Sequence, residues 1–170
     1  QLQANFSVDV SRDRNNTQWY DNIIDTSGTI HYTFAHLRQR TISMSTRLNY
    51  TMTRDLTFEF YGQPFLATGT YSDFREVSDT PGAADYDDRF DSIEPAANAK
   101  TSFKLRQLRT NAVVRWEYRP GSTLFVVWAH GRQDDSNQNL GQSWRRDYRE
   151  LFALHPDNTF LIKVAYWFDR

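Results

Sequence analysis

Apolar and polar side chains alternate with a period of two over segments of about ten residues, and this pattern constrains the fold most strongly. Every second residue from Leu2 to Val10 is apolar, and the residues between them are polar. The same alternation returns over residues 42–52, 56–61, 111–118 and 160–168. Successive side chains of a β-strand point to opposite faces, so each segment predicts a strand with one apolar and one polar face. Residues 123–130 also read as a strand, but both of its faces are apolar and its orientation stays open.

The composition of the chain bears on whether the sheet is water-soluble or membrane-embedded. Hydrophobic residues make up 39% of the 170 residues, and the mean hydropathy is −0.73, which is typical of a soluble protein. Aromatic residues nevertheless reach 15%. A transmembrane barrel reconciles the two, because only alternate residues face lipid and aromatics gather at the membrane interfaces. No apolar run approaches the roughly 20 residues that a membrane helix needs.

The connections between the predicted strands alternate strictly in length. Residues 53–55 and 119–122 form short turns, the second with Pro120-Gly121, which is favourable turn chemistry. The other connections are long and polar, over residues 12–40, 68–104 and 131–158, although Tyr32 and Phe34 alternate and suggest a strand extension. Outer-membrane barrels have short periplasmic turns and long extracellular loops. We therefore expect a bacterial outer-membrane location with the C-terminus in the periplasm.

These features predict an all-β fold, an antiparallel up-and-down transmembrane β-barrel. The chain would supply its C-terminal portion of about six strands, as one barrel segment over residues 1–170. About eight strands are the fewest that enclose an interior in a membrane barrel, so either the long connections contain further strands or other strands lie outside this sequence. The second is the preferred interpretation. A soluble sandwich or lipocalin-like barrel, acting as a ligand binder, is the alternative.

Three segments resemble a known family. They are Arg115-Trp116-Glu117-Tyr118-Arg119-Pro120-Gly121-Ser122-Thr123-Leu124-Phe125, Tyr61-Gly62-Gln63-Pro64-Phe65 and Phe160-Leu161-Ile162-Lys163-Val164-Ala165-Tyr166-Trp167-Phe168. The chain from about Arg40 onward is similar to the C-terminal barrel of a bacterial family of unassigned function. Its members pair an N-terminal carbohydrate-binding module of the family-9 type with an outer-membrane β-barrel.

The resemblance implies a function as well as a fold. It implies an N-terminal sugar-binding module and earlier strands, and a porin-like role in binding or passing small solutes such as saccharides. The alternative is a structural anchor or a component of a cell-surface assembly. The expected partners are outer-membrane lipid, the barrel-assembly machinery, and the remaining strands of a longer chain or other envelope proteins. The resemblance supplies no catalytic residue.

Charged residues on the polar faces are the candidate functional residues. We expect them to face the lumen, either pairing across strands to fill the interior or lining a solute pathway. They are Arg47, Glu59, Arg115, Glu117 and Lys163. The closing strand carries the aromatic spacing of an outer-membrane assembly signal at Phe160, Ile162, Val164, Tyr166 and Phe168, with Asp169 and Arg170 after it.

Metal binding and a cofactor are not expected. Four carboxylates cluster at Asp85, Asp87, Asp88 and Asp91 and are weak candidates for a Ca²⁺ site. They lack the spacing of an EF-hand, so a solvated acidic loop is the preferred interpretation. The four histidines match no zinc motif, and the chain has no cysteine.

Catalysis and nucleic-acid binding are not expected either. Ser43 or Ser45 with His130 and Asp134 would supply the residue types of a hydrolytic triad, but no nucleophile motif surrounds either serine. We therefore predict that the chain is not an enzyme. With 20 basic and 21 acidic side chains, it carries no excess positive charge for a nucleic acid.

Residues 144–154 are the only segment with helical periodicity. Tyr148, Leu151, Phe152 and Leu154 follow near i, i+3, i+4 spacing, and His155-Pro156 would end the helix. A helix here would plug the barrel mouth, rest on lipid headgroups through its three arginines, or simply pack within its loop. Packing within the loop is the preferred interpretation.

Overall fold

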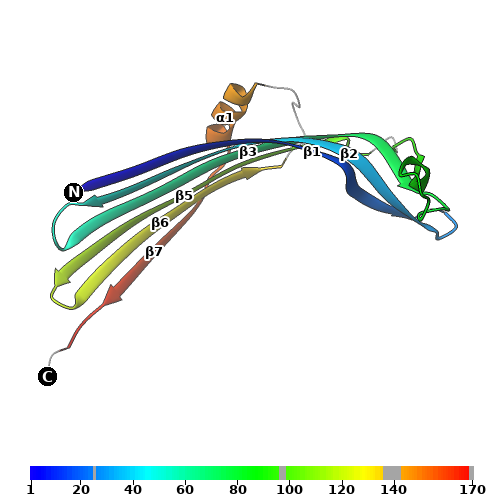
Figure 1. The fold of residues 1–170 in the computed structure, drawn as a ribbon. Helices are drawn as coiled ribbons and strands as arrows, with labels where there is room; N and C mark the ends of the chain where they lie inside the picture. The colour runs from blue at the N-terminus through cyan, green and yellow to red at the C-terminus, as the bar shows by residue number, and fades with distance from the viewer. Residues whose placement is uncertain (25, 96–98, 136–142, 169–170) are drawn as a thin grey trace.

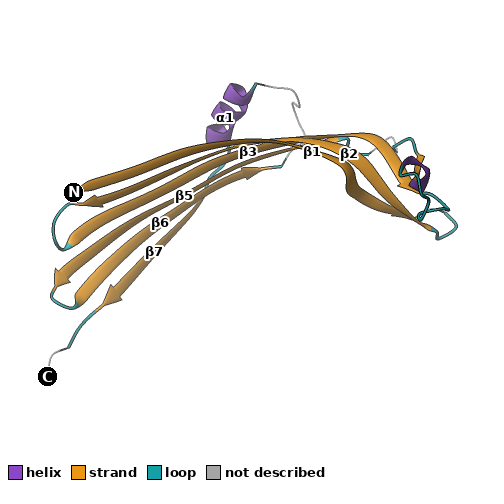
Figure 2. Cartoon of the chain, in the orientation of Figure 1, coloured by secondary structure: helices purple, strands orange, loops and turns teal. Residues whose placement is uncertain are grey.

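The computed structural model describes residues 1–24, 26–95, 99–135 and 143–168. Most of the chain forms one antiparallel sheet (Figure 2). Its strands are β1 (Leu2–Ile24), β2 (Ile30–Thr51), β3 (Leu56–Val77), β4 (Phe90–Ser92), β5 (Ser102–Arg119), β6 (Ser122–Asp134) and β7 (Asp157–Ala165). The helical elements are the 3₁₀ turn η1 (Asp87–Arg89) and the α-helix α1 (Trp144–Ala153).

The strands follow one another in space in nearly the order of the sequence. The sheet order is β1-β2-β3-β5-β6-β7, and the short β4 pairs with the far end of β3. Each consecutive pair is antiparallel. The predicted all-β, antiparallel up-and-down architecture is therefore confirmed. The sheet is open within the described residues, with β1 and β7 at its two edges.

The register sorts the side chains onto two faces. Val10 pairs with Ile42, Ile42 with Leu66, and Leu66 with Arg106, so even-numbered residues share one face. This "apolar face" also carries Leu124, Val126 and Trp128 of β6, whose orientation the sequence left open. Odd-numbered residues of the same strands form the "polar face". The alternation that predicted the strands thus runs in register across the sheet.

The two short turns are where the sequence predicts them, and they define the "turn end" of the sheet. β2 passes to β3 through residues 52–55, and β5 passes to β6 through Pro120-Gly121. Gly121 has a φ of +76°, a conformation that glycine adopts without strain. The N-terminus and the last residue of β7 lie at this end (Figure 1). β7 therefore runs toward the short turns, as the parity of the connections predicted.

Two of the three long polar connections, residues 12–40 and 68–104, are wrong as predictions of loops. β1 and β2 continue through most of residues 12–40 and pair up to Ile24–Ile30, and Tyr32 and Phe34 do lie in β2. β3 likewise extends to Val77, and β4 adds a short strand within residues 68–104. The error has a physical cause. These extensions begin with polar runs and their apolar residues do not alternate regularly, so the apolar period that marks a strand disappears although the backbone ladder continues.

The predicted helix is confirmed as α1, which packs on the apolar face. Figure 1 shows the sheet arching lengthwise, with α1 on the convex side about midway along the strands. The helix lies between β6 and β7 in the chain. No helix in the described ranges has the length and apolar character needed to cross a membrane.

Candidate functional site

The five predicted charged residues all lie on the polar face, in its turn-end half. Arg115 and Glu117 form an ion pair at 3.3 Å, and the Glu117 carboxylate also accepts the Gly121 backbone N–H at 3.1 Å. The Arg47 guanidinium lies over the ring of Tyr61, its register partner, at 5.5 Å from the centroid. Among the described contacts, no ion pair joins Arg47, Glu59 or Lys163. The Arg115–Glu117 pair therefore stabilises the turn between β5 and β6, and the other three charged residues form no ion pair among the described residues.

The closing strand presents its alternation at a sheet edge. Phe160, Ile162 and Val164 lie on the apolar face, paired with Trp128, Val126 and Leu124. β7 ends at Ala165, so Tyr166 and Phe168 follow the strand; their rings meet edge-on at 4.6 Å. The role of this spacing as an assembly signal stays a prediction.

A small hydrophobic core joins α1 to the sheet. Leu151 is fully buried against Ile42, Leu66 and Leu108, one residue from each of three neighbouring strands. Tyr148 and Leu154 pack around this contact. Full burial of one leucine stabilises by about 2–3 kcal/mol, so Leu151 anchors the helix. Burial raises the pKa of Tyr148, and its hydroxyl is buried without a hydrogen-bond partner.

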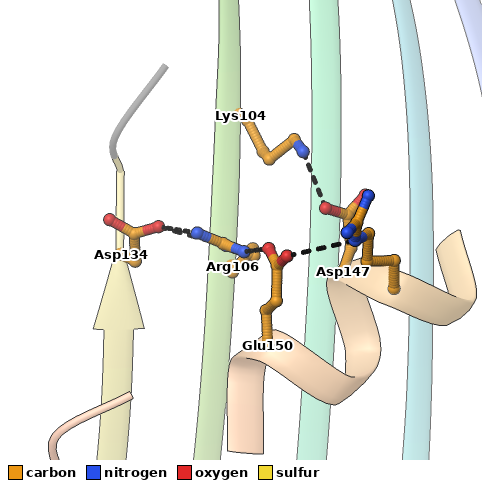
Figure 3. A network of polar contacts seen from close by, with 6 residues as sticks. Lys104, Arg106, Asp134, Asp147 and Glu150 are labelled. Atoms are coloured by element: carbon orange, nitrogen blue, oxygen red, sulfur yellow. Dashed lines mark hydrogen bonds and ion pairs between the residues drawn. The ribbon is translucent and has the colours of Figure 1, made fainter. Parts of the chain in front are cut away.

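Charged residues surround this core and tie α1 to β5 and β6 (Figure 3). The Lys104 ammonium contacts the Asp147 carboxylate at 2.6 Å, and these side chains are 2% and 7% exposed. Arg106 bridges two carboxylates, Glu150 of α1 at 2.5 Å and Asp134 at the end of β6. A buried pair of this kind adds little net stability, but its geometry fixes where the helix sits.

The end of the helix is held as well. The Arg132 guanidinium of β6 donates to the backbone carbonyls of Phe152 and, at 3.0 Å, Leu154. The last carbonyls of a helix lack partners within the helix and carry partial negative charge, so a cation is favourable there. We call this set of contacts the "α1 dock". It comprises Leu151, Asp147 and Glu150 of the helix with their partners on the sheet, together with Arg132.

Sequence reasoning did not find the sheet partners in the α1 dock. Lys104 and Arg106 fall at and just beyond the end of a segment that reads as a loop, so their burial was not expected. A signal was nevertheless present in the helix. Asp147, Glu150 and Leu151 share one helical face, and two carboxylates beside a leucine imply basic partners opposite.

The residues considered for catalysis do not meet. Ser43 and Ser45 lie on the polar face, and Ser45 bonds the Ser7 hydroxyl at 2.7 Å. His130 lies on the apolar face, where Asn158 contacts its Nδ1 at 2.9 Å. Asp134 contacts Arg106. The sheet separates the serines from the histidine, so this set is not a triad.

The acidic segment is spread over two elements. Asp87 and Asp88 lie in η1, whereas Asp91 lies in β4 opposite Glu76. Across the described ranges, no three histidine or carboxylate side chains gather closely enough to hold a metal ion.

A cleft of about 700 Å³ lies at the far end of the sheet from the short turns. Its aromatic lining comes from Tyr20, Tyr71, Phe74 and Phe103, and Asp21 and Lys100 also border it. The Phe103 ring lies over Gly69, where a Cβ would approach it to 2.1 Å, so that close approach needs glycine. Apolar walls with a few polar groups are typical of small-molecule sites.

Comparison with known proteins gives one match. Residues 1–170 match the domain of unknown function DUF5916, so the match covers the whole sequence. The chain belongs to this family. The match confirms membership in a family of unassigned function, and it carries no information about a carbohydrate-binding module or the outer membrane. No curated protein and no solved structure matches the DUF5916 chain.

Proposed function

We propose that this DUF5916 chain is a wall segment of a bacterial outer-membrane β-barrel that binds or passes small solutes. The apolar face contacts lipid, and the polar face lines a hydrated interior. The short turns face the periplasm, and further strands from the rest of the protein or from other chains close the barrel.

The slanted upper limit of the apolar band carries this proposal. On each strand of the apolar face, this limit is the last apolar residue before the polar extension. The limits are Val10, Ile42, Leu66, Leu108, Trp128 and Phe160. The first three form one row in register. The limit then steps toward the turn end, by two residues at Leu108 and by four more at Trp128.

The slope of this limit matches the strand tilt of a membrane barrel. Six residues correspond to about 20 Å along the strands, and the five steps from β1 to β7 to about 24 Å across them. Averaged over all five steps, the slope is about 40°, although the limit is level from β1 to β3 and from β6 to β7. Strands of membrane barrels tilt by about 35–45°. A flat membrane surface meets tilted strands along such a line. A soluble sheet has no reason to end its apolar residues on a diagonal.

The height and exposure of the band agree with lipid contact. From Ile42 to Met52 the apolar face spans about 33 Å of strand, or about 25 Å along the membrane normal at this tilt. The apolar band of outer-membrane barrels is about 25 Å tall. Phe6, Phe160 and Ile162 are 67%, 71% and 69% exposed, a cost that lipid removes.

Two neighbouring valines allow a matched test of the two faces. Val126 lies on the apolar face and Val127 on the polar face, both half-buried in β6. The chain has no cysteine, so Val126→Cys and Val127→Cys each add one labelling site. In vesicles containing the full-length protein, a fluorophore at residue 126 is expected to be quenched by brominated acyl chains. One at residue 127 should be quenched by aqueous iodide.

The opposite or an equal response of the two labels would contradict lipid contact by the apolar face. Aqueous quenching at both positions would instead support the soluble alternative.

Solute passage has its own test. The polar face carries Arg47 and Lys163 without a carboxylate of the described residues in ion-pair contact, and charges that line a lumen tune selectivity. The full-length protein in planar bilayers is expected to conduct, and Arg47→Glu should shift its reversal potential toward cation selectivity. A silent barrel would argue against passage and leave an anchoring role.

A further inference from the structure

Four arginines form two cross-strand pairs on the apolar face, directly above the apolar band. Arg12 pairs with Arg40 and Arg14 with Arg38 in the ladder between β1 and β2, and all four are exposed. Like charges directly opposite one another destabilise a sheet. Within the described part of the chain, no carboxylate forms an ion pair with any of this "arginine quartet".

Lys104 lies in the same cross-strand row as Arg40, and there the chain itself provides a carboxylate partner. Arg40 pairs with Thr68 and Thr68 with Lys104, so the three lie side by side across β2, β3 and β5. Asp147 of α1 contacts Lys104 at 2.6 Å. The charge of the quartet is therefore open to an anion from outside the chain.

The height of the quartet specifies what kind of anion meets it. Arg12 and Arg40 follow the last apolar residues, Val10 and Ile42, by two positions. Two residues of a strand tilted by about 40° rise about 5 Å along the membrane normal. If the apolar band spans the hydrocarbon, the quartet lies at the level of the lipid headgroups.

We propose that the arginine quartet binds the phosphate of a lipid headgroup in the leaflet at the loop end of the barrel. This inference rests on the proposed function. An arginine guanidinium holds phosphate oxygens through paired N–H donors in a fixed geometry, and arginine is more weakly hydrated than lysine. Four of them on two adjacent strands offer several such contacts to one phosphorylated amphiphile.

The surroundings of the quartet suit a headgroup. A hollow of about 320 Å³ is bordered by the four arginines and by Thr68 and Thr70, whose hydroxyls add donors. Asp13 also borders it, but its carboxylate accepts the Ser11 hydroxyl at 3.2 Å.

Helix α1 forms the neighbouring wall. Trp144 lines a second hollow together with Arg40, and Arg145 lies over the Trp144 ring at 5.4 Å. Asp147 lines it too, with its carboxylate bound to Lys104. Tryptophan and arginine are favoured at the headgroup level, where apolar and charged surroundings meet. The helix therefore extends the quartet along the membrane surface.

Native mass spectrometry of the full-length protein tests the proposal, with diphosphoryl lipid A and its dephosphorylated form as probes. The unmodified protein is expected to prefer the phosphorylated form by about tenfold or more, and Arg38→Gln with Arg40→Gln should remove about tenfold of that affinity. Arg12→Gln with Arg14→Gln on β1 provides a second variant if the first fails to fold. Arg109→Gln, an exposed arginine on the polar face, is the control for Arg40→Gln and should change nothing.

Equal binding of the two lipids, or unchanged binding by both double variants, would overturn the proposal. Full competition by inorganic phosphate at equal concentration would also overturn it, since the site would then recognise free phosphate. The Val126→Cys label in the same preparations separates the two claims. If brominated lipid quenches the label but the two lipid A forms bind equally, only the headgroup inference is wrong. If brominated lipid does not quench the label, the proposed function is wrong as well.

Discussion

Asp147→Ala is expected to release α1 from the sheet. The substitution removes the carboxylate that contacts Lys104, whose ammonium is 2% exposed. Removing one partner of a buried ion pair costs about 3–5 kcal/mol, and here the buried Lys104 ammonium loses its contact with this carboxylate. A helix of 10 residues is not stable alone, so its release also unfolds it. Hydrogen exchange of the amides in residues 144–153 should therefore accelerate by about two to three and a half orders of magnitude, at about tenfold per 1.4 kcal/mol.

Two controls separate the charge from the packing. Arg146→Ala removes an exposed i,i+4 partner of Glu150 at 3.6 Å and should cost about 0.5 kcal/mol or less. The double variant Lys104→Met with Asp147→Leu should recover most of the lost protection, since apolar residues of similar volume replace a buried pair at little cost. Slow exchange in the single Asp147 variant would mean that Leu151 and the contacts made by Arg106 and Arg132 hold the helix without this ion pair.

The parts of the fold that the sequence predicts are those where one face meets an apolar environment. Alternation marks β1 from Leu2 to Val10 because lipid or core selects every second residue there. From Ser11 to Gln18 both faces of β1 are polar, and the ladder to β2 continues through backbone hydrogen bonds that any sequence can make. The sequence therefore does not predict how far a strand continues once its side chains no longer alternate between apolar and polar.

The candidate site divides in the same way. All five predicted charges are on the polar face because strand periodicity alone decides the face. The α1 dock depends instead on contacts such as Lys104 with Asp147, 43 residues apart, and local periodicity carries no information about which strand a helix covers. The slant of the apolar band is also invisible in the sequence. It emerges only when the register of all six long strands is known.

Val114→Arg is expected to cost about 2–4 kcal/mol, the penalty for arginine near the midplane of an outer-membrane barrel on its lipid face. Val114 lies on the apolar face of β5 between Phe58 and Val126, near the middle of the apolar band. In the proposed lipid-facing band, a charged side chain there would displace lipid contacts, and its register partners Phe58 and Val126 offer no carboxylate. Equilibrium refolding of the full-length protein from denaturant into lipid vesicles measures the free energy of unfolding for this comparison.

Val113→Arg is the matched control, because it places the same side chain one residue away on the polar face. Val113 lies opposite Glu59, so the new guanidinium gains a cross-strand carboxylate and should be tolerated within about 0.5 kcal/mol. A soluble sheet would not show this difference between the two substitutions. With water on the apolar face, arginine at residue 114 would replace a half-buried valine and could extend its guanidinium into water, so the cost would be small. An equal effect of the two substitutions would therefore contradict a lipid-facing band, whatever the closure of the barrel.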